Sequence, residues 1–242
     1  MKYRITDIHM HVLPAVDDGA RTLEEACEML RLAAGQGVEA VFATPHDAAF
    51  LNADVPAALR LLKEAAAQRG IPVELYLGCE LRFSAQTAAE RLRGLAEGLY
   101  PTMGASRCVL TEFTFGTSLR EALYCINTLA GHGYKPIVAH VERYPETDLA
   151  YARALREAGA LLQINAGSIA EEPDEQVRRR VKLLLSERLA DLIGTDAHRT
   201  DRRPPLFGGG MEALRRLYTE EYALLLAAEN PEKYLFAPAA RE

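Results

Sequence analysis

The chain has 242 residues, of which 49% are hydrophobic and 26% are charged, and its net charge is −6. This composition is typical of a soluble globular protein that folds as one large domain of about 200–250 residues. The acidic balance argues against a nucleic-acid-binding face, and the densest basic run, residues 178–180, is interpreted as a solvated helix face.

The N-terminal residues do not form a secretory signal, because Lys2, Arg4 and Asp7 interrupt any apolar stretch. The longest apolar run, residues 222–228, is far too short to span a bilayer. We therefore expect a cytoplasmic protein without stable membrane insertion. The four cysteines form no CxxC pair, and none is followed six residues later by the arginine that cysteine-dependent phosphatases require.

Short apolar segments alternate with helical patterns along the chain. The segments with the length and composition of buried strands are 3–13, 38–46, 71–81, 108–113, 135–144, 160–169 and 189–198. The helical patterns that follow them are 22–37, 54–70, 84–98, 118–133, 148–159, 173–189 and 211–228. Thr22 and Glu25 form a capping-box pattern at the start of the first helix. Residues 204–210 are glycine-rich but lack the Lys-Ser/Thr of a phosphate loop, so we interpret them as a plain loop.

The repeated order of strand and helix favours parallel strands joined by helical crossovers. We predict an α/β fold, namely a closed or nearly closed (β/α)7 barrel. No linker divides the sequence, so residues 1–242 are expected to form a single domain. A doubly wound open sheet is the alternative.

Residues that can bind metal ions stand at or just beyond the C-terminal ends of six of the seven predicted strands. These candidates are His9, His11, Asp18, His46, Glu80, Glu112, His140, Asp196 and His198. The sixth strand ends at Asn165 and offers no such residue, and His132 lies at a predicted helix end where no ligand is expected. A single histidine at a strand end is more often structural, but active sites of β/α barrels form at these ends. The regularity therefore predicts a shared metal site.

Two pairs of candidates converge if the barrel closes between its first and last strands. His9 with His11, and Asp196 with His198, stand two residues apart and would point to the same side of their strands. Nine candidates exceed the needs of one zinc ion, so two or three divalent ions, bridged by Glu80 or another carboxylate, fit better. Mixed histidine and carboxylate ligands favour Mn, Fe or Zn. Such multi-metal sites commonly hydrolyse phosphate esters.

Two arginines extend this interpretation. Arg143 follows the fifth predicted strand and Arg203 follows the seventh, so both would overhang the metal site. Guanidinium groups bind phosphate oxygens bidentately, although a surface salt bridge is the alternative for each. Arg199 and Arg202 compete with Arg203 for the second position.

The motifs together resemble a known superfamily. The segments DIHMHVLPAVDDGA, ATPH, LGCE, LTEF, AHVERY, LQINAGS and GTDAH match, in order, the motifs of the polymerase-and-histidinol-phosphatase (PHP) superfamily. More narrowly, they resemble the PHP-type protein tyrosine phosphatases of bacterial capsule and exopolysaccharide loci, from about Thr6 to Pro205. The HxH pair alone is a weak signal, whereas its combination with LPxVDDGA, AHxERY and LQINAGS is specific to this subgroup.

The resemblance implies a distorted (β/α)7 barrel of the PHP type with a trinuclear site, typically supported by Mn, with Fe, Zn or Mg as alternatives. It implies three ligand sets: His9, His11, Glu80 and Asp196; Glu80, Glu112 and His140; and Asp18, His46 and His198. Arg143 and Arg203 match the phosphate-binding arginines of the family.

We therefore predict a metal-dependent protein-tyrosine phosphatase that acts on a phosphotyrosine protein, such as a bacterial tyrosine kinase controlling capsule or exopolysaccharide synthesis. A metal-activated hydroxide would attack phosphorus in line, and Arg143 and Arg203 would stabilise the charge on its oxygens. Asp196 or His198 is the candidate for a proton relay. The principal alternative is a small-molecule phosphomonoesterase of the histidinol-phosphatase type. A PHP nuclease fits the acidic charge less well, and a non-enzymatic metal-binding domain does not need so complete a ligand set.

Overall fold

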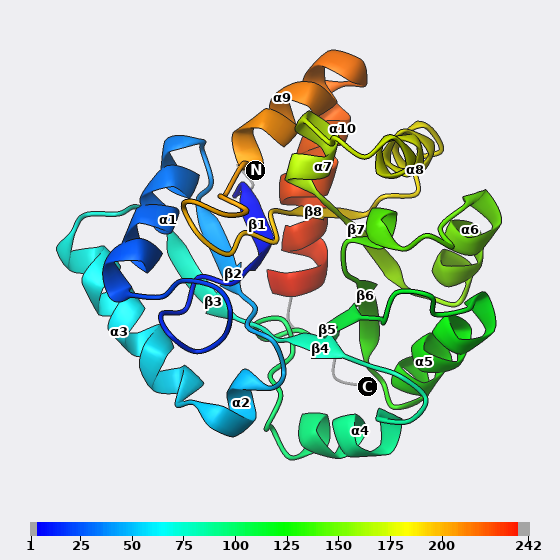
Figure 1. The fold of residues 1–242 in the computed structure, drawn as a ribbon, viewed down its shortest axis with the longest axis horizontal. Helices are drawn as coiled ribbons and strands as arrows, with labels where there is room; N and C mark the ends of the chain where they lie inside the picture. The colour runs from blue at the N-terminus through cyan, green and yellow to red at the C-terminus, as the bar shows by residue number, and fades with distance from the viewer. Residues whose placement is uncertain (1–3, 237–242) are drawn as a thin grey trace.

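The computed structural model describes residues 4–236, whose parallel strands form a distorted barrel surrounded by helices (Figure 1). The strands are β1 (Thr6–Met10), β2 (Ala40–Ala43), β3 (Glu74–Leu77), β4 (Glu80–Arg82), β5 (Cys108–Glu112), β6 (Lys135–Val138), β7 (Leu161–Asn165) and β8 (Leu192–Gly194). The α-helices are α1 (Leu23–Gly35), α2 (Ala49–Asn52), α3 (Val55–Gln68), α4 (Ala88–Ala96), α5 (Leu119–Gly131), α6 (Leu149–Glu157), α7 (Ala166–Ala170), α8 (Glu175–Ser186), α9 (Phe207–Leu217) and α10 (Glu220–Leu224). A 3-10 turn, η1 (Val141–Arg143), and two π-helical segments, η2 (Leu225–Glu229) and η3 (Glu232–Phe236), complete the secondary structure.

The strands pair in the orders β1-β2-β3 and β4-β5-β6-β7-β8. Backbone bonds close the barrel between β1 and the segment after β8. Asp196 N donates to His9 O at 2.8 Å, and His11 N donates to Ala197 O at 2.8 Å. This closure confirms the predicted barrel over the open sheet.

The third predicted strand is broken into two pieces, because β3 pairs with β2 whereas β4 pairs with β5. The break lies at Gly78, where an added Cβ would stand 2.5 Å from Met103 Sδ. At this seam, a bridge between His46 and Glu80 joins the two sheets. Glu80 therefore begins a short strand where the two sheets meet.

Most predicted helices are confirmed: α1, α3, α4, α5, α6 and α8 lie within their expected ranges. Thr22 caps α1 by accepting a hydrogen bond from Glu25 N at 3.1 Å. The Glu25 carboxylate accepts from Arg21 N instead of Thr22 N, so only half of the predicted capping box forms.

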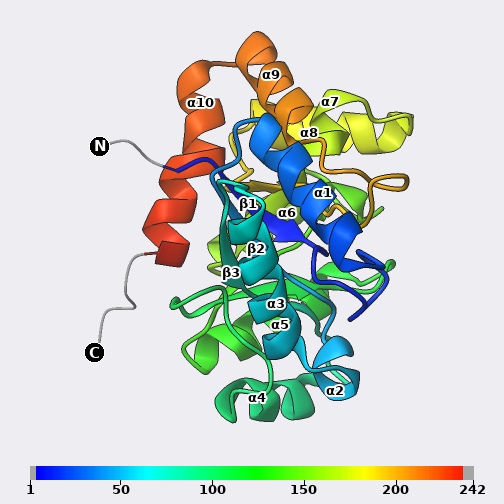
Figure 2. The same ribbon diagram turned by 90° about the vertical axis from the view of Figure 1, so that its left-hand side faces the viewer.

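The last predicted helix is wrong as a single element. The chain breaks at Tyr218, which has φ −129° and ψ −105°, and Thr219 then caps α10 by accepting from Tyr222 N. The preceding helix, α9, is held close to α7, because an added Cβ at Gly210 would stand 2.7 Å from Ala166 O. This close packing sets the direction of α9, and α10 turns away from it (Figure 2).

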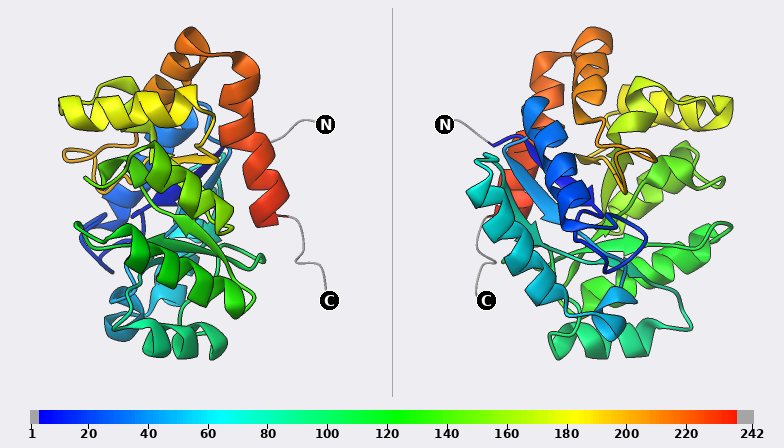
Figure 3. Two further views of the ribbon diagram at one scale, coloured as in Figure 1. Left: turned by 90° about the vertical axis from the view of Figure 1, so that its right-hand side faces the viewer. Right: turned by 60° about the vertical axis from the view of Figure 1, so that its left-hand side comes forward.

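A small apolar cluster fills the inside of the barrel, and a larger one lies between the strands and the surrounding helices. The inner cluster includes Ile8, Phe42, Leu110 and Leu192. Leu235 of η3 joins it, so the C-terminal segment covers the end of the barrel at which the chain enters β1 (Figures 2 and 3). The polar strand ends lie at the opposite end. Within residues 4–236, no helix is long and apolar enough to cross a membrane.

Candidate metal centre

Two histidines from β1 point into the mouth of the barrel. His9 lies within β1 and His11 directly follows it, and both are fully buried. Their Nε2 atoms stand 3.3 Å apart, which confirms that this pair shares one side. Two imidazole nitrogens this close face a common electrophile or share a proton, so the pair is well placed to bind a cation.

Glu80 lies at the centre of the histidines. Its Oε1 stands 2.9 Å from His140 Nε2 and 3.4 Å from His9 Nε2. Its Oε2 stands 3.0 Å from His46 Nδ1 and 3.2 Å from His11 Nε2. Burial opposes the ionised carboxylate, but the surrounding imidazoles hold the pKa of Glu80 well below its usual range. A charged carboxylate with one oxygen toward each group of histidines is suited to bridge two cations.

Asp196 completes the central group from the segment after β8. Its Oδ1 faces His9 at 3.6 Å and His11 at 3.5 Å, whereas its Oδ2 accepts hydrogen bonds from Arg143 at 3.1 Å and Arg203 at 2.9 Å. Although burial opposes ionisation, the neighbouring imidazoles lower the pKa of Asp196 to about 2. One carboxylate therefore connects the candidate metal residues to both arginines.

The remaining candidates lie on either side of this centre. Asp18 Oδ1 stands 3.4 Å from Nε2 of both His46 and His198. Glu112 Oε1 stands 3.8 Å from His140 Nε2, and its Oε2 accepts from Arg82 at 2.9 Å. The structure thus brings all nine predicted residues to one end of the barrel.

Ligand atoms in three overlapping groups come within 4.8 Å of one another: His11, Asp18, His46 and His198; His9, His11, Glu80 and Asp196; and His46, Glu80 and Glu112. The second group contains the same residues as one set implied by the family resemblance. The third group has His46 where the resemblance implies His140, although His140 Nε2 is also within 2.9 Å of Glu80.

The side chains at this centre carry the kinds of atoms that bind divalent cations. Imidazole nitrogens and carboxylate oxygens lie within 4.8 Å of one another in each group, and His198 Nε2 is buried without a hydrogen-bond partner among residues 4–236. Such an unpaired buried nitrogen costs free energy unless something binds it. Mixed nitrogen and oxygen ligands suit Mn, Fe or Zn.

The carboxylates also shift the pKa values of the histidines. Burial would lower the pKa of His11, but Asp17 and Glu80 outweigh this effect and raise it well above 6.5. At His9 and His46, burial would also lower the pKa, but nearby carboxylates such as Glu80 outweigh it and raise the pKa. At His198, burial and the nearby His11 lower the pKa to about 4. The centre therefore attracts positive charge while keeping one imidazole neutral.

Several residues that hold the candidate ligands in place were not assigned a site role from the sequence. Asp17, interpreted as capping a turn, does accept from Gly19 N at 3.0 Å, but its Oδ2 also contacts His11 Nδ1 at 2.8 Å. Gln163 Oε1 accepts from His140 N at 2.9 Å and stands 3.2 Å from His9 Nδ1. A glutamine between the apolar residues Leu162 and Ile164 of β7 is the signal that could indicate this role.

The two predicted arginines line the centre, whereas the competitor Arg199 contacts a neighbouring loop. A cavity of about 180 Å³ at the mouth is lined by candidate ligands together with Arg82, Phe115, Arg143 and Arg203. Arg199 instead points its Nε toward Gly19 O at 3.4 Å. Arg82 is paired with Glu112 at 2.9 Å, whereas Arg143 and Arg203 both approach Asp196, so these two guanidinium groups lie beside the candidate metal residues where an anion would bind.

Several predicted strands end earlier than expected, and the segment 160–169 stops being a strand at Asn165, because residues 166–170 form α7. Two of these early ends carry candidate ligands in left-handed turns. The fifth predicted strand ends at Val138, and His140 then adopts a left-handed conformation with φ 33°. The seventh ends at Gly194, and Asp196 has φ 52°. The expectation that Asp196 and His198 share a strand face is therefore wrong. A tight turn, not strand alternation, brings both side chains to the centre.

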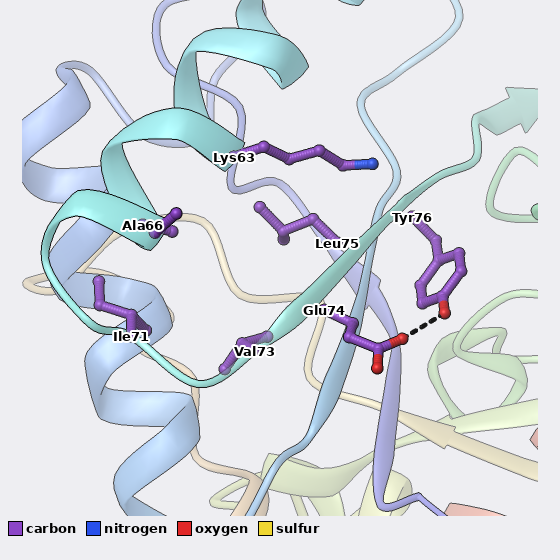
Figure 4. A pocket seen from close by; sticks show the side chains of 8 residues that line it. Lys63, Ala66, Ile71, Val73, Glu74, Leu75 and Tyr76 are labelled. Carbon is purple, nitrogen blue, oxygen red and sulfur yellow. Dashed lines mark hydrogen bonds between the residues drawn. The ribbon is translucent and has the colours of Figure 1, made fainter.

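Other features contribute no ligand. His132 is exposed at the end of α5, where its Nδ1 contacts Thr128 O at 2.8 Å, as predicted for a histidine outside the site. The prediction of a plain loop over 204–210 holds only for residues 204–206, because residues 207–210 form the first turn of α9, which begins four residues before the predicted start at 211. A separate cavity of about 370 Å³ lies between α3 and β3, where the Tyr76 hydroxyl donates to Glu74 (Figure 4). It contains none of the predicted site residues.

The comparisons with known proteins agree with this arrangement. A family model described as "Capsular polysaccharide synthesis, CpsB/CapC" matches residues 5–236. The chain is 31% identical to tyrosine-protein phosphatase YwqE of Bacillus subtilis, over 95% of this chain and 91% of that protein. It is 27% identical to tyrosine-protein phosphatase CpsB of Streptococcus agalactiae, over 95% of this chain and 97% of that protein.

Solved structures extend the likeness to the fold. The chain superposes with a TM-score of 0.84 and 30% identity on a structure described as YwqE from Bacillus subtilis and CpsB from Streptococcus pneumoniae, "unique metal-dependent tyrosine phosphatases", covering 96% of this chain and 94% of that one. A phosphotriesterase homology protein from Escherichia coli shares the fold with a TM-score of 0.66 at 15% identity, covering 96% of this chain and 99% of that one.

Proposed function

This chain belongs to the capsular polysaccharide synthesis CpsB/CapC family, and from that premise we propose that it is a metal-dependent protein-tyrosine phosphatase. The observation that carries the proposal is the joint approach of Arg143 and Arg203 to Asp196, beside the candidate metal residues. In this arrangement, a phosphate group would meet metal cations on one side and two guanidinium groups on the other.

We propose three divalent ions, most simply Mn, held by His9, His11, Asp18, His46, Glu80, Glu112, His140, Asp196 and His198. When bound, such ions lower the pKa of water to about 7 and neutralise charge on phosphate oxygens. Glu80 would be shared between two of them, a proposal supported by its two oxygens, which face different histidines.

The protein's own groups would orient the phosphate. Arg143 and Arg203 would donate to its outer oxygens, where charge increases as the ester bond breaks. Asp196 Oδ2 fixes both guanidinium groups in advance, so that less side-chain entropy is lost on binding. His198 or Asp196 is the proposed proton relay; the pKa of about 4 keeps the His198 ring neutral near pH 7, so it would accept a proton there.

A phosphotyrosine protein, for example a bacterial tyrosine kinase that controls capsule or exopolysaccharide synthesis, is the proposed substrate. This assignment is supported by the names of the related phosphatases. A cytoplasmic location and a single domain over residues 1–242 are parts of the same proposal. All four cysteines are free and buried, which is compatible with a reducing compartment.

The experiment compares two arginine variants on a phosphotyrosine peptide and on an alkyl phosphate, with Mn and with a chelator. Arg203→Ala should lower kcat/KM on the peptide about 10- to 100-fold, the value of a charge-assisted hydrogen bond, while bound metal is retained. Arg199→Ala is the matched control and should remain active. Faster hydrolysis of the alkyl phosphate by the wild type, or activity that survives metal removal, would contradict the proposal.

A further inference from the structure

An exposed aromatic ring stands at the mouth of the metal centre. Phe115 is 61% exposed and lies in the turn that follows β5, two residues before Thr117. The turn is closed by Thr117 N and Thr117 Oγ1, which both donate to Thr114 O, at 3.1 Å and 2.7 Å. Gly116 has φ +87°, a conformation that other residues adopt at a cost. This fold of the turn holds a large apolar side chain in solvent, where it gains little from the core.

The Phe115 ring lies next to Tyr144 and Arg143. It stands 5.9 Å from the ring of Tyr144, whose hydroxyl accepts from Phe113 N at 2.9 Å and which is almost fully buried. The guanidinium carbon of Arg143 is also 5.9 Å from the Phe115 ring. Tyr144 in turn stands 5.8 Å from the ring of His140. Phe115 is thus an aromatic surface that is held in place next to the phosphate-facing arginine.

Phe115 also lies between two cavities. The cavity at the metal centre, of about 180 Å³, and a second one of about 440 Å³ share Phe115, Arg143 and Arg203 in their walls. The second cavity continues over Asn165 and along Val177 of α8. Sites that bury a whole drug-sized ligand occupy roughly 300–1,000 Å³, so the first cavity suits ions and a phosphate group but not an aromatic ring as well.

We propose that Phe115 is the residue that recognises the phenol ring of the substrate, and that the second cavity receives the residues next to it in the polypeptide. This inference rests on the proposed function. With the phosphate beside Arg143 and Arg203, the ester oxygen leads outward past Phe115, and the phenol ring packs against it. A substrate with an alkyl phosphate lacks that contact, so Phe115 makes the site selective for aryl phosphates.

The first experiment measures binding to the Mn-loaded protein by calorimetry, without turnover. The probes are phenylphosphonate and methylphosphonate, which share the phosphorus group and differ in the ring. Phe115→Ala should weaken phenylphosphonate binding by roughly 2- to 12-fold, the range that an aromatic pair contributes, and leave methylphosphonate binding unchanged. An equal effect on both probes, or no effect on either, overturns the inference.

Matched variants separate ring recognition from a general disturbance. Phe115→Tyr keeps the ring and should retain the preference for phenylphosphonate. Tyr124→Ala removes another half-exposed aromatic ring, on α5, and should behave as the wild type. Because Phe115 is exposed, its removal should leave the unfolding temperature unchanged, and the same sample reports this.

The second experiment tests the path of the polypeptide. Val177→Phe partly fills the second cavity and should lower kcat/KM for a phosphotyrosine peptide at least threefold, with p-nitrophenyl phosphate hydrolysis unchanged. Equal kcat/KM for the peptide in variant and wild type overturns this path. If the wild type does not hydrolyse phosphotyrosine at all, the proposed function fails, whereas the phosphonate comparison still decides whether Phe115 binds a ring.

Discussion

Asp17 provides the most quantitative test of how the candidate metal centre is held together. Its carboxylate is almost fully buried, and it accepts from three groups: His11 Nδ1 at 2.8 Å, Gly19 N at 3.0 Å and His46 N at 3.2 Å. The contact on Nδ1 turns His11 so that its Nε2 faces Glu80. Asp17→Asn keeps the size of the side chain but removes the charge, and its amide nitrogen cannot accept from the ring.

The magnitude follows from the pKa of Asp17. Although burial opposes ionisation, the hydrogen bond and charge of His11 lower this pKa from 3.8 to about 2. The difference corresponds to about 2.5 kcal/mol of stability. Because the pKa is depressed in the folded state, this contribution is fully present above pH 4 and is lost as the pH falls toward 2. Metal-free Asp17→Asn should therefore unfold about 5–10 °C lower at pH 7.

Metal binding supplies the second measurement. Carboxylates that orient a metal-binding histidine typically account for about 10- to 100-fold in metal affinity. Calorimetric titration of Mn into Asp17→Asn should show a loss in that range. The control is Asp201→Asn, the same substitution at an exposed carboxylate that contacts Arg21. Mn affinity within twofold of the wild type, together with an unchanged unfolding temperature, would refute the reasoning.

Three further predictions concern pH and packing. Since the pKa values of three site histidines are raised, metal-free protein should lose stability as the pH rises above 6.5, and the increase in unfolding temperature caused by Mn should grow between pH 6 and 9. Gly210→Ala would place a Cβ 2.7 Å from Ala166 O and should lower the free energy of unfolding by about 1–3 kcal/mol. Its control is Gly35→Ala in α1, where the added Cβ meets nothing within 4 Å; this variant should raise the free energy of unfolding by up to about 1 kcal/mol. Leu235→Ala, inside the barrel, should cost about 2–5 kcal/mol in chemical denaturation without changing Mn affinity.

The order of strands and helices could be predicted because their signals are local. Apolar runs and caps such as Thr22 depend on residues a few positions apart, and they survived in the structure. The convergence of His9 and Asp196 could also be predicted, since parallel strands bring their C-terminal ends to one face of a barrel. Residue type then limited the chemistry, because imidazoles and carboxylates together suit few purposes other than metal binding.

What could not be predicted depends on contacts distant in sequence. The break at Tyr218 lies inside an apolar helical pattern, and its one local signal is Thr219, an N-cap residue followed by two acidic residues; the close packing of α9 on α7 through Gly210 is not visible in the sequence. The burial of Leu235 inside the barrel depends on how the chain returns after that break. Asp17 showed only a turn pattern in sequence, since its contact with His11 requires the loop to fold back over β1.

The backbone at the centre explains why the strand ends were misplaced. His140, Asp196 and Arg203 have φ of 33°, 52° and 54°, and they make up three of the five non-glycine residues with left-handed φ in the described chain. Such conformations cost on the order of 1–3 kcal/mol each, and glycine would remove most of that cost. Glycine would also remove an imidazole, a carboxylate or a guanidinium group from the mouth of the barrel. Neighbours hold these turns instead: Gln163 accepts from His140 N, and His9 O accepts from Asp196 N. Strain is thus concentrated at positions where the chemistry of the side chain outweighs the preference of the backbone, and a sequence pattern that assumes regular strands fails at those positions.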